Sequence, residues 1–104
     1  MNGIFRVQKV TGFRQFQGKN NNGNPETVDV VGVVLRQGTS DIYAEAYRKQ
    51  HDKIKEANLA PGDLVGCRLS SYVQERTKDG TVYISTQFVI DDIDVWLSNS
   101  PQTF

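Results

Sequence analysis

The side chains with the clearest chemical potential in this chain are aromatic and basic residues spaced for one face of a sheet. Arg68, Tyr72 and Arg76 are separated by multiples of two residues, so a strand would project all three to the same side. Tyr83 would lie near them across a hairpin. Phenol rings accept stacked nucleobases, and guanidinium groups pair with phosphates. The spacing therefore favours binding of a nucleic acid strand.

Two further segments are expected to add to this face. Tyr43 and Tyr47 would project outward from the third strand, and Arg6 and Gln8 from the first. The predicted stacking residues are Tyr47, Tyr72 and Tyr83, and the predicted backbone contacts are Arg6, Arg14, Arg68 and Arg76. The alternative is that tyrosines simply favour strands, while charged side chains protect strand edges.

Catalysis has little support in the sequence. The single histidine, His51, and the single cysteine, Cys67, provide neither a zinc-binding set nor a catalytic triad. We expect His51 on the surface of a polar helix and Cys67 in the core. The carboxylates of Asp91, Asp92 and Asp94 could bind a hard cation, and a hydrolase or metal-dependent enzyme centred on them is one rival hypothesis. The prediction is no enzyme, no metal and no cofactor.

The N-terminal third predicts two strands. Residues 4–16 alternate between apolar and polar, and Gly12 marks a bend of the kind that closes small barrels. A polar loop over residues 18–25 follows. Residues 26–36 are rich in valine, and the nearly continuous apolar run predicts a strand buried on both faces.

Residues 41–47 fit a strand by alternation, although helical spacing also links some of their side chains to the residues that follow. One helix over residues 40–58 would be roughly 28 Å long, which is long for so small a domain. We therefore predict a strand followed by a helix near residues 48–58, which caps one end of a barrel. The turn at residues 60–63 ends it.

Residues 64–76 and 81–90 alternate and are joined by a hairpin turn at residues 77–80. The side chains expected to point inward are Val65, Cys67, Leu69, Val73, Val82, Ile84, Phe88 and Ile90. This order of elements predicts an all-β fold with one short helix, a five-stranded Greek-key barrel.

Composition indicates one domain, residues 1–96, with a polar tail at 97–104. Net charge is zero, yet the first 25 residues hold four cations and no acid, whereas four acids and no cation occur from Asp79 onward. Such separation allows a positive groove on a neutral protein. The lone cysteine favours a reducing compartment, and neither a signal peptide nor a membrane span is evident. We expect a soluble cytoplasmic protein without a membrane partner.

The order of the elements, the passage at residues 41–47, the passage at 59–66 and the long hairpin together resemble the bacterial-type single-stranded DNA-binding protein family. The resemblance covers roughly residues 3–95. It implies an OB fold, binding of single-stranded DNA more than RNA with little sequence preference, a role in replication or repair, and a homodimer or homotetramer. It also implies that Tyr47 stacks a base and that Tyr72 and Arg76 line the path of the strand.

The chain departs from that family in two places. Ser40-Asp41 stands where the family often has Trp, and no acidic residue follows Asp94, although Phe104 is the last residue of the sequence, as in the family. Whether the tail recruits a partner is left open by the sequence. The alternative function is a protein-interaction or assembly module on the same fold that does not bind nucleic acid.

Overall fold

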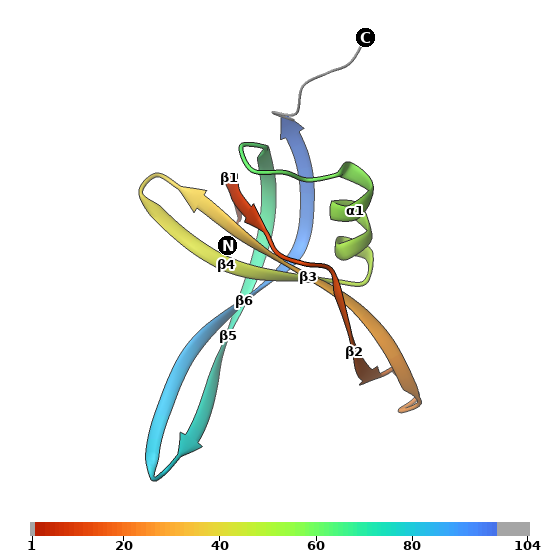
Figure 1. Ribbon diagram of the computed structural model, residues 1–104, viewed down its shortest axis with the longest axis vertical. Coiled ribbons are helices and arrows are strands. Elements are labelled where there is room, and N and C mark those ends of the chain that lie inside the picture. The colour runs from red at the N-terminus through yellow and green to blue at the C-terminus, as the bar shows by residue number, and fades with distance from the viewer. Residues whose placement is uncertain (1, 98–104) are drawn as a thin grey trace.

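The computed structural model describes residues 2–97, most of which lie in strands (Figure 1). The elements are β1 (Asn2–Val10), β2 (Arg14–Lys19), β3 (Pro25–Gln37), β4 (Ser40–Tyr47), α1 (Lys49–Ala57), β5 (Leu64–Lys78) and β6 (Thr81–Leu97). The predicted all-β architecture with one short helix is confirmed.

The predicted first strand is divided into β1 and β2 by a break at residues 11–13. Both parts pair with β3, and β1 also pairs with β5, so that the sheet closes into a five-stranded barrel. Thr11 fixes the break, because its hydroxyl donates to the Gly32 carbonyl oxygen at 3.0 Å and accepts the Gly32 N–H at 2.9 Å. The bend that was predicted at Gly12 is therefore held by the side chain of the preceding residue, Thr11.

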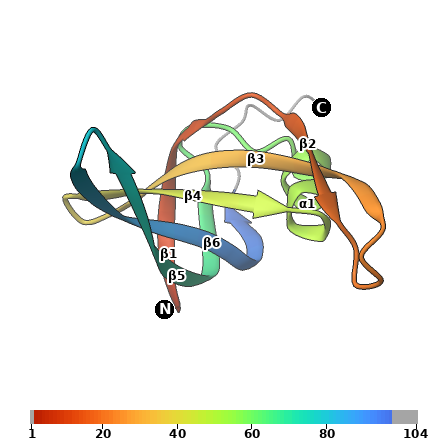
Figure 2. The ribbon, with the colours of Figure 1, turned by 90° about the horizontal axis from the view of Figure 1, so that it is seen from below.

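Strand β3 lies at the centre of the fold, between β2, β4 and β1 (Figure 2). Its adjacent residues Val30 and Val31 point to opposite sides and are both buried, as the valine-rich run predicted. Leu35, together with Phe5 and Val7 of β1, is also buried in the barrel core. Apolar burial on this scale is the main stabilising term of the fold.

Helix α1 covers one end of the barrel and has the predicted position. Asn58 ends it in the left-handed conformation, with its N–H directed at the carbonyls of Ile54 and Lys55. The side chain of Ile54 is buried and seals the barrel. The turn that follows is tied to β1, since Gly62 N–H donates to the Val7 carbonyl oxygen at 2.8 Å.

The β5–β6 hairpin extends well beyond the barrel (Figure 1). Its two-residue turn, Asp79-Gly80, has positive φ at both positions, as a twisted hairpin requires. The prediction that Val73, Val82 and Ile84 point into the core is wrong, because these side chains are 66%, 52% and 69% exposed. They lie on the part of the hairpin that no second layer covers.

Closer to the barrel, the inward pattern of the hairpin holds: Val65, Cys67, Leu69 and Ile90 are buried, and Phe88 is half-buried against the core. The predicted tail began at residue 97. Leu97 is the last residue of β6, and the tail from residue 98 onward lies outside the described residues.

Candidate nucleic-acid interface

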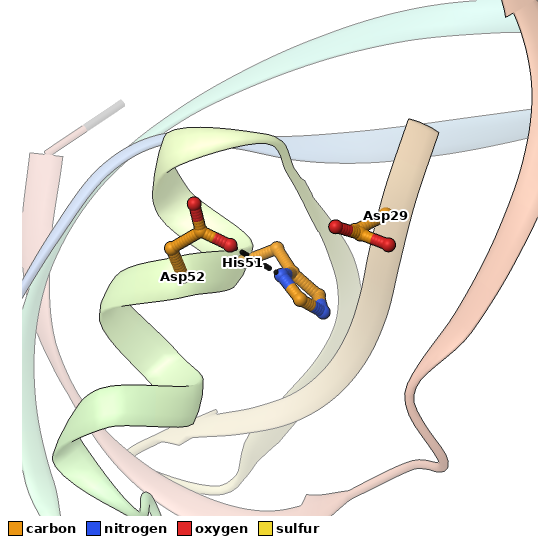
Figure 3. Close-up of side chains that lie close together, drawn as sticks. All are labelled: Asp29, His51 and Asp52. Atoms are coloured by element: carbon orange, nitrogen blue, oxygen red, sulfur yellow. Dashed lines mark hydrogen bonds and ion pairs between the residues drawn. The ribbon is translucent and has the colours of Figure 1, made fainter. Parts of the chain in front are cut away.

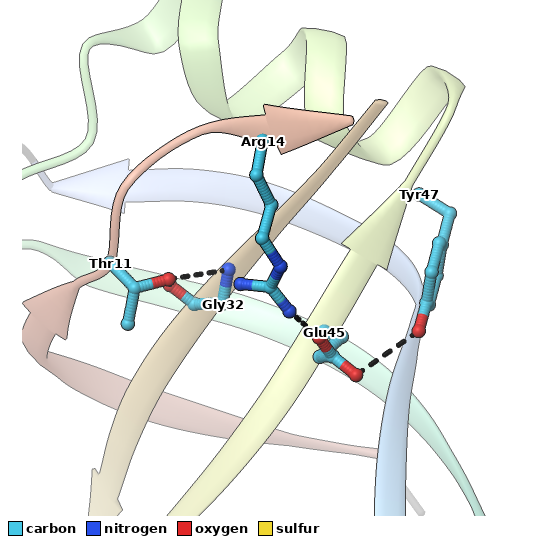
Figure 4. A network of polar contacts seen from close by, with 5 residues as sticks. All are labelled: Thr11, Arg14, Gly32, Glu45 and Tyr47. Carbon is cyan, nitrogen blue, oxygen red and sulfur yellow. Dashed lines mark hydrogen bonds and ion pairs between the residues drawn. The ribbon is translucent and has the colours of Figure 1, made fainter. Parts of the chain in front are cut away.

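The outer face of β4 carries a connected polar network with Glu45 at its centre (Figure 4). Arg14 of β2 forms an ion pair with the Glu45 carboxylate, and the Tyr47 hydroxyl donates to Glu45 Oε1 at 3.1 Å. The Glu45 side chain is only 19% exposed, whereas Arg14 is 50% exposed. A carboxylate therefore holds one cation and one phenol in fixed positions on the surface of the barrel.

Tyr43 packs against the backbone beside this network. A Cβ atom at Gly32 would lie 2.1 Å from Tyr43 Oη, so only glycine allows the ring to lie there. The hydrogen bond between Tyr43 and Arg14, followed by the attraction of Glu45, raises the pKa of the Arg14 guanidinium. Arg14 is therefore positioned from two sides.

Three aromatic rings from different strands gather at the edge of the network. Phe16 of β2 meets Tyr47 edge to face, with ring centroids 5.9 Å apart. Burial, chiefly, and the Glu45 carboxylate raise the pKa of Tyr47 to about 12, and the nearby Tyr72 of β5 adds to the shift. Phe16 and Tyr72 are 44% and 50% exposed, so both rings offer apolar area to a ligand.

The sequence patterns did not identify Phe16 as a residue of the candidate interface. The available signal was its spacing of two residues from Arg14, which places both side chains on one face of a strand.

The hairpin continues the same face away from the barrel. Arg76 is directly opposite Tyr83, and Tyr72 is opposite Gln87. Four residues of strand separate Tyr72 from Arg76, roughly 13 Å at 3.3 Å per residue. The path from the barrel toward the hairpin tip thus passes Tyr47, then Tyr72, and then the facing pair Arg76 and Tyr83.

The two remaining predicted residues lie on the barrel side of Tyr72: Arg68 is exposed on the same face of β5, four residues away, and Arg6 lies farther off. Arg68 is in register with Asn2 and Asp92, beside a cavity that Trp96 also lines. Arg6 donates to the Gly62 carbonyl oxygen at 2.9 Å and pairs with Leu64, eight residues along β5 from Tyr72. That separation is roughly 26 Å of strand.

The carboxylates at residues 91–94 do not form one site. Ser70 donates to Asp91, and Lys53 Nζ lies 2.8 Å from Asp92 and 3.8 Å from Asp94. The Lys53 hydrogen bond lowers the pKa of Asp92. The group of potential metal ligands found among residues 2–97 does not include these three carboxylates.

The lone cysteine is buried as predicted, and burial raises the pKa of Cys67 to about 12, which disfavours the reactive thiolate. The surface position predicted for His51 is wrong. The residue is 4% exposed, and the Phe13 ring meets its imidazole edge to face at 5.3 Å.

No protein-family model matches the chain, and no curated protein sequence matches it. Solved structures do. The second OB-fold domain of replication protein A from Methanococcus maripaludis superposes with a TM-score of 0.59 at 14% identity, over 96% of this chain and 86% of that one. The mitochondrial single-stranded DNA-binding protein Rim1 from S. cerevisiae gives a TM-score of 0.53 at 16% identity, over 95% of both chains. These similarities confirm the predicted OB fold.

The helix of the described residues, 2–97, is too short and too polar to span a membrane.

Proposed function

We propose that this chain is a non-catalytic protein that binds single-stranded nucleic acid, DNA more than RNA, with little sequence preference. The observation that carries the proposal is the outer face on which Phe16, Tyr47 and Tyr72 gather beside the Arg14 guanidinium. Exposed rings beside fixed cations suit a strand whose bases stack and whose phosphates need neutralising. Both structural neighbours are described as belonging to single-stranded DNA-binding or replication proteins, which supports the same proposal.

In this proposal the strand runs from the barrel onto the hairpin. Tyr47, Tyr72 and Phe16 stack bases at the barrel, and Tyr83 stacks a base near the tip. Arg14 and Arg76 contact phosphates along that path. Arg68, four residues from Tyr72 on the barrel side of β5, contacts a phosphate next to the barrel, and Arg6 contacts only a longer strand that continues around it.

The test is a titration of a fluorescently labelled dT oligomer at two salt concentrations. The double variant Arg68→Ala plus Arg76→Ala should bind more weakly and with a flatter salt dependence, because each lost phosphate contact removes roughly 0.7 from the logarithmic salt slope on a single strand. Each of the two single variants should account for part of the loss.

Arg36→Ala is the matched control. Its guanidinium is bound by Asp41 at 2.7 and 3.0 Å and should contribute little to binding. Equal binding by the double variant and the parent protein would exclude these arginines from the interface. A parallel titration with an rU oligomer tests the preference for DNA.

A second candidate function is an assembly module, and the exposed Val73, Val82 and Ile84 favour it. These side chains form an apolar strip on the hairpin, and a net charge of zero imposes little self-repulsion. Sedimentation equilibrium and the salt-dependent titration together distinguish the two functions. The assembly module predicts self-association without salt-sensitive oligonucleotide binding.

The nucleic-acid proposal also includes assembly into a homodimer or homotetramer, a cytoplasmic location and a role in replication or repair, as for the family that the sequence resembles. The nucleic-acid proposal therefore predicts both self-association and salt-sensitive oligonucleotide binding.

A further inference from the structure

His51 takes no part in the proposed interface, yet it belongs to the one group of potential metal ligands found among residues 2–97. A ring nitrogen of His51 and one carboxylate oxygen each from Asp29 and Asp52 all lie within 4.8 Å of one another. Figure 3 shows the imidazole projecting from α1 between the two carboxylates, with Asp29 on the neighbouring strand β3.

The positions of all three side chains are fixed by local structure. His51 and Asp52 are adjacent in α1, and Nδ1 of His51 lies 2.9 Å from Asp52 Oδ1. The helix is tied to β3 because Arg48 N–H donates to the Asp29 carbonyl oxygen at 3.2 Å. The Gln15 amide donates to Asp29 Oδ1 at 2.8 Å, which orients that carboxylate from the side of β2.

The His51 imidazole is mostly buried and lines a cavity together with Asp29 and Phe13. The His51 side chain is 5% exposed, and within residues 2–97 its only hydrogen bond is the one to Asp52. Its other ring contact is with the apolar edge of Phe13. No buried side-chain nitrogen or oxygen among residues 2–97 lacks a hydrogen-bond partner, so the second ring nitrogen of His51 is not sealed from the cavity that its side chain lines.

We propose that His51, Asp29 and Asp52 bind a divalent transition-metal ion such as Zn²⁺ or Co²⁺, with water in the remaining positions. Imidazole favours these ions over Mg²⁺ and Ca²⁺, and two carboxylates beside a neutral imidazole match the charge of a divalent cation. The ion would join α1 to β3 at the end of the barrel that the helix covers.

The distances suit this proposal. Two donors that are each about 2.1 Å from one ion lie roughly 3.0–3.4 Å apart at octahedral or tetrahedral angles. The 2.9 Å between His51 Nδ1 and Asp52 Oδ1 is already close to that value. Asp29 has to approach, which rotation of its side chain allows, and the Asp52 side chain is 61% exposed and free to adjust.

Two cations line the adjoining cavity and weigh against the ion. They are Arg14, whose guanidinium is bound by Glu45, and Lys55, whose side chain is exposed. Within residues 2–97, neither cation forms an ion pair with Asp29 or Asp52. The competing account is that the hydrogen bonds from His51 to Asp52 and from Gln15 to Asp29 hold these side chains without any metal.

The experiment titrates Co²⁺ into the untagged chain and records the visible absorption of the bound ion, with Zn²⁺ added as competitor. Because His51 is the only histidine, the imidazole ¹⁵N signals of the protein report on one site. We expect Zn²⁺ to shift these signals and to raise the melting temperature. No shift of the His51 signals with Zn²⁺ would overturn the proposal.

The decisive variant is Asp29→Asn, which keeps an oxygen for the Gln15 hydrogen bond and should fold. It should weaken Co²⁺ binding at least about tenfold, the loss expected even for an outer-shell partner. Asp91→Asn is the matched control and should bind as the parent does. Parental affinity in Asp29→Asn would also contradict the proposal, and none of these results depends on nucleic acid binding.

Discussion

Glu45 sets the electrostatics of the candidate interface at the scale of single residues. Its carboxylate lies in the middle of a face proposed to receive phosphates, and it is bound by Arg14 and the Tyr47 hydroxyl (Figure 4). It therefore neutralises the cation that a ligand would use, while holding that cation and the Tyr47 ring in place. Glu45 both organises and weakens the site.

The variant Glu45→Gln separates these two effects. It keeps a hydrogen-bond acceptor for Tyr47 but releases Arg14 from its ion pair. We expect tighter binding of a dT oligomer at low salt, with a salt slope steeper by roughly 0.7, the value for one further phosphate contact on a single strand. Weaker binding with an unchanged slope would mean that the organising effect dominates.

Gly32 determines the position of Tyr43. The variant Gly32→Ala places a Cβ atom 2.1 Å from Tyr43 Oη, so the ring must move. We expect a loss of about 1–3 kcal/mol in the free energy of unfolding, measured by urea denaturation. The double variant Gly32→Ala plus Tyr43→Ala removes the clash and should recover part of the loss. No recovery would place the strain elsewhere.

Tyr47 gives the protein a stability change at alkaline pH. Its pKa is raised from 10.0 to about 12, mainly by burial, so the folded state favours the neutral phenol. The stabilisation is fully present below pH 10 and is lost as the pH rises toward 12. In denaturation curves at increasing pH, Tyr47→Phe should lose less stability over this range than the parent. Identical losses would assign the change to other groups.

At the scale of elements, the β5–β6 hairpin stands out because its outer half extends beyond the barrel and does not pack against the core. Both faces of its outer half are exposed, and its strands pair only with each other beyond Tyr72 and Gln87. The barrel therefore does not need this part in order to fold, whereas the proposed path of the strand does.

Shortening the hairpin tests this division. Residues 74–85 are replaced by Asn-Gly, which joins Val73 to its partner Thr86 through a two-residue turn. We expect the free energy of unfolding to change by less than roughly 1 kcal/mol, because no buried residue is removed. Affinity for a dT oligomer should fall at least about fivefold, since stacking on Tyr83 is worth about 1–3 kcal/mol per base. Unaltered affinity would confine the interface to the barrel.

The sequence patterns predicted the helix and the strands correctly, but they did not predict which side chains the rest of the fold covers. The valine density of β3 and the polar helix after residue 47 predicted their structures correctly, because local preference and burial agree there. The alternation in the hairpin was also real. It could not show that Val73 and Ile84 lie beyond the reach of a second layer, because strand length relative to the barrel is a tertiary property.

The whole molecule places its charges unevenly, although its net charge is zero. Arg14 of the cationic N-terminal part lies on the candidate interface, whereas Asp92 and Asp94 of the acidic C-terminal part are paired with Lys53 of α1. The sequence predicted a shared face for seven residues. Closure of the barrel carries Arg6 of β1 to the end of β5 that is remote from Tyr72, and alternation along separate strands cannot reveal this curvature.

The most direct test of the central claim is amide chemical-shift mapping by NMR while an unlabelled dT oligomer is added to the ¹⁵N-labelled chain. The account predicts that the largest shifts cluster at Arg14 and Phe16 on β2, at Tyr47 on β4 and along the hairpin from Tyr72 to Tyr83. Shifts that are absent at saturating oligomer, or confined to the end of the barrel near Arg6 and Trp96, would contradict it.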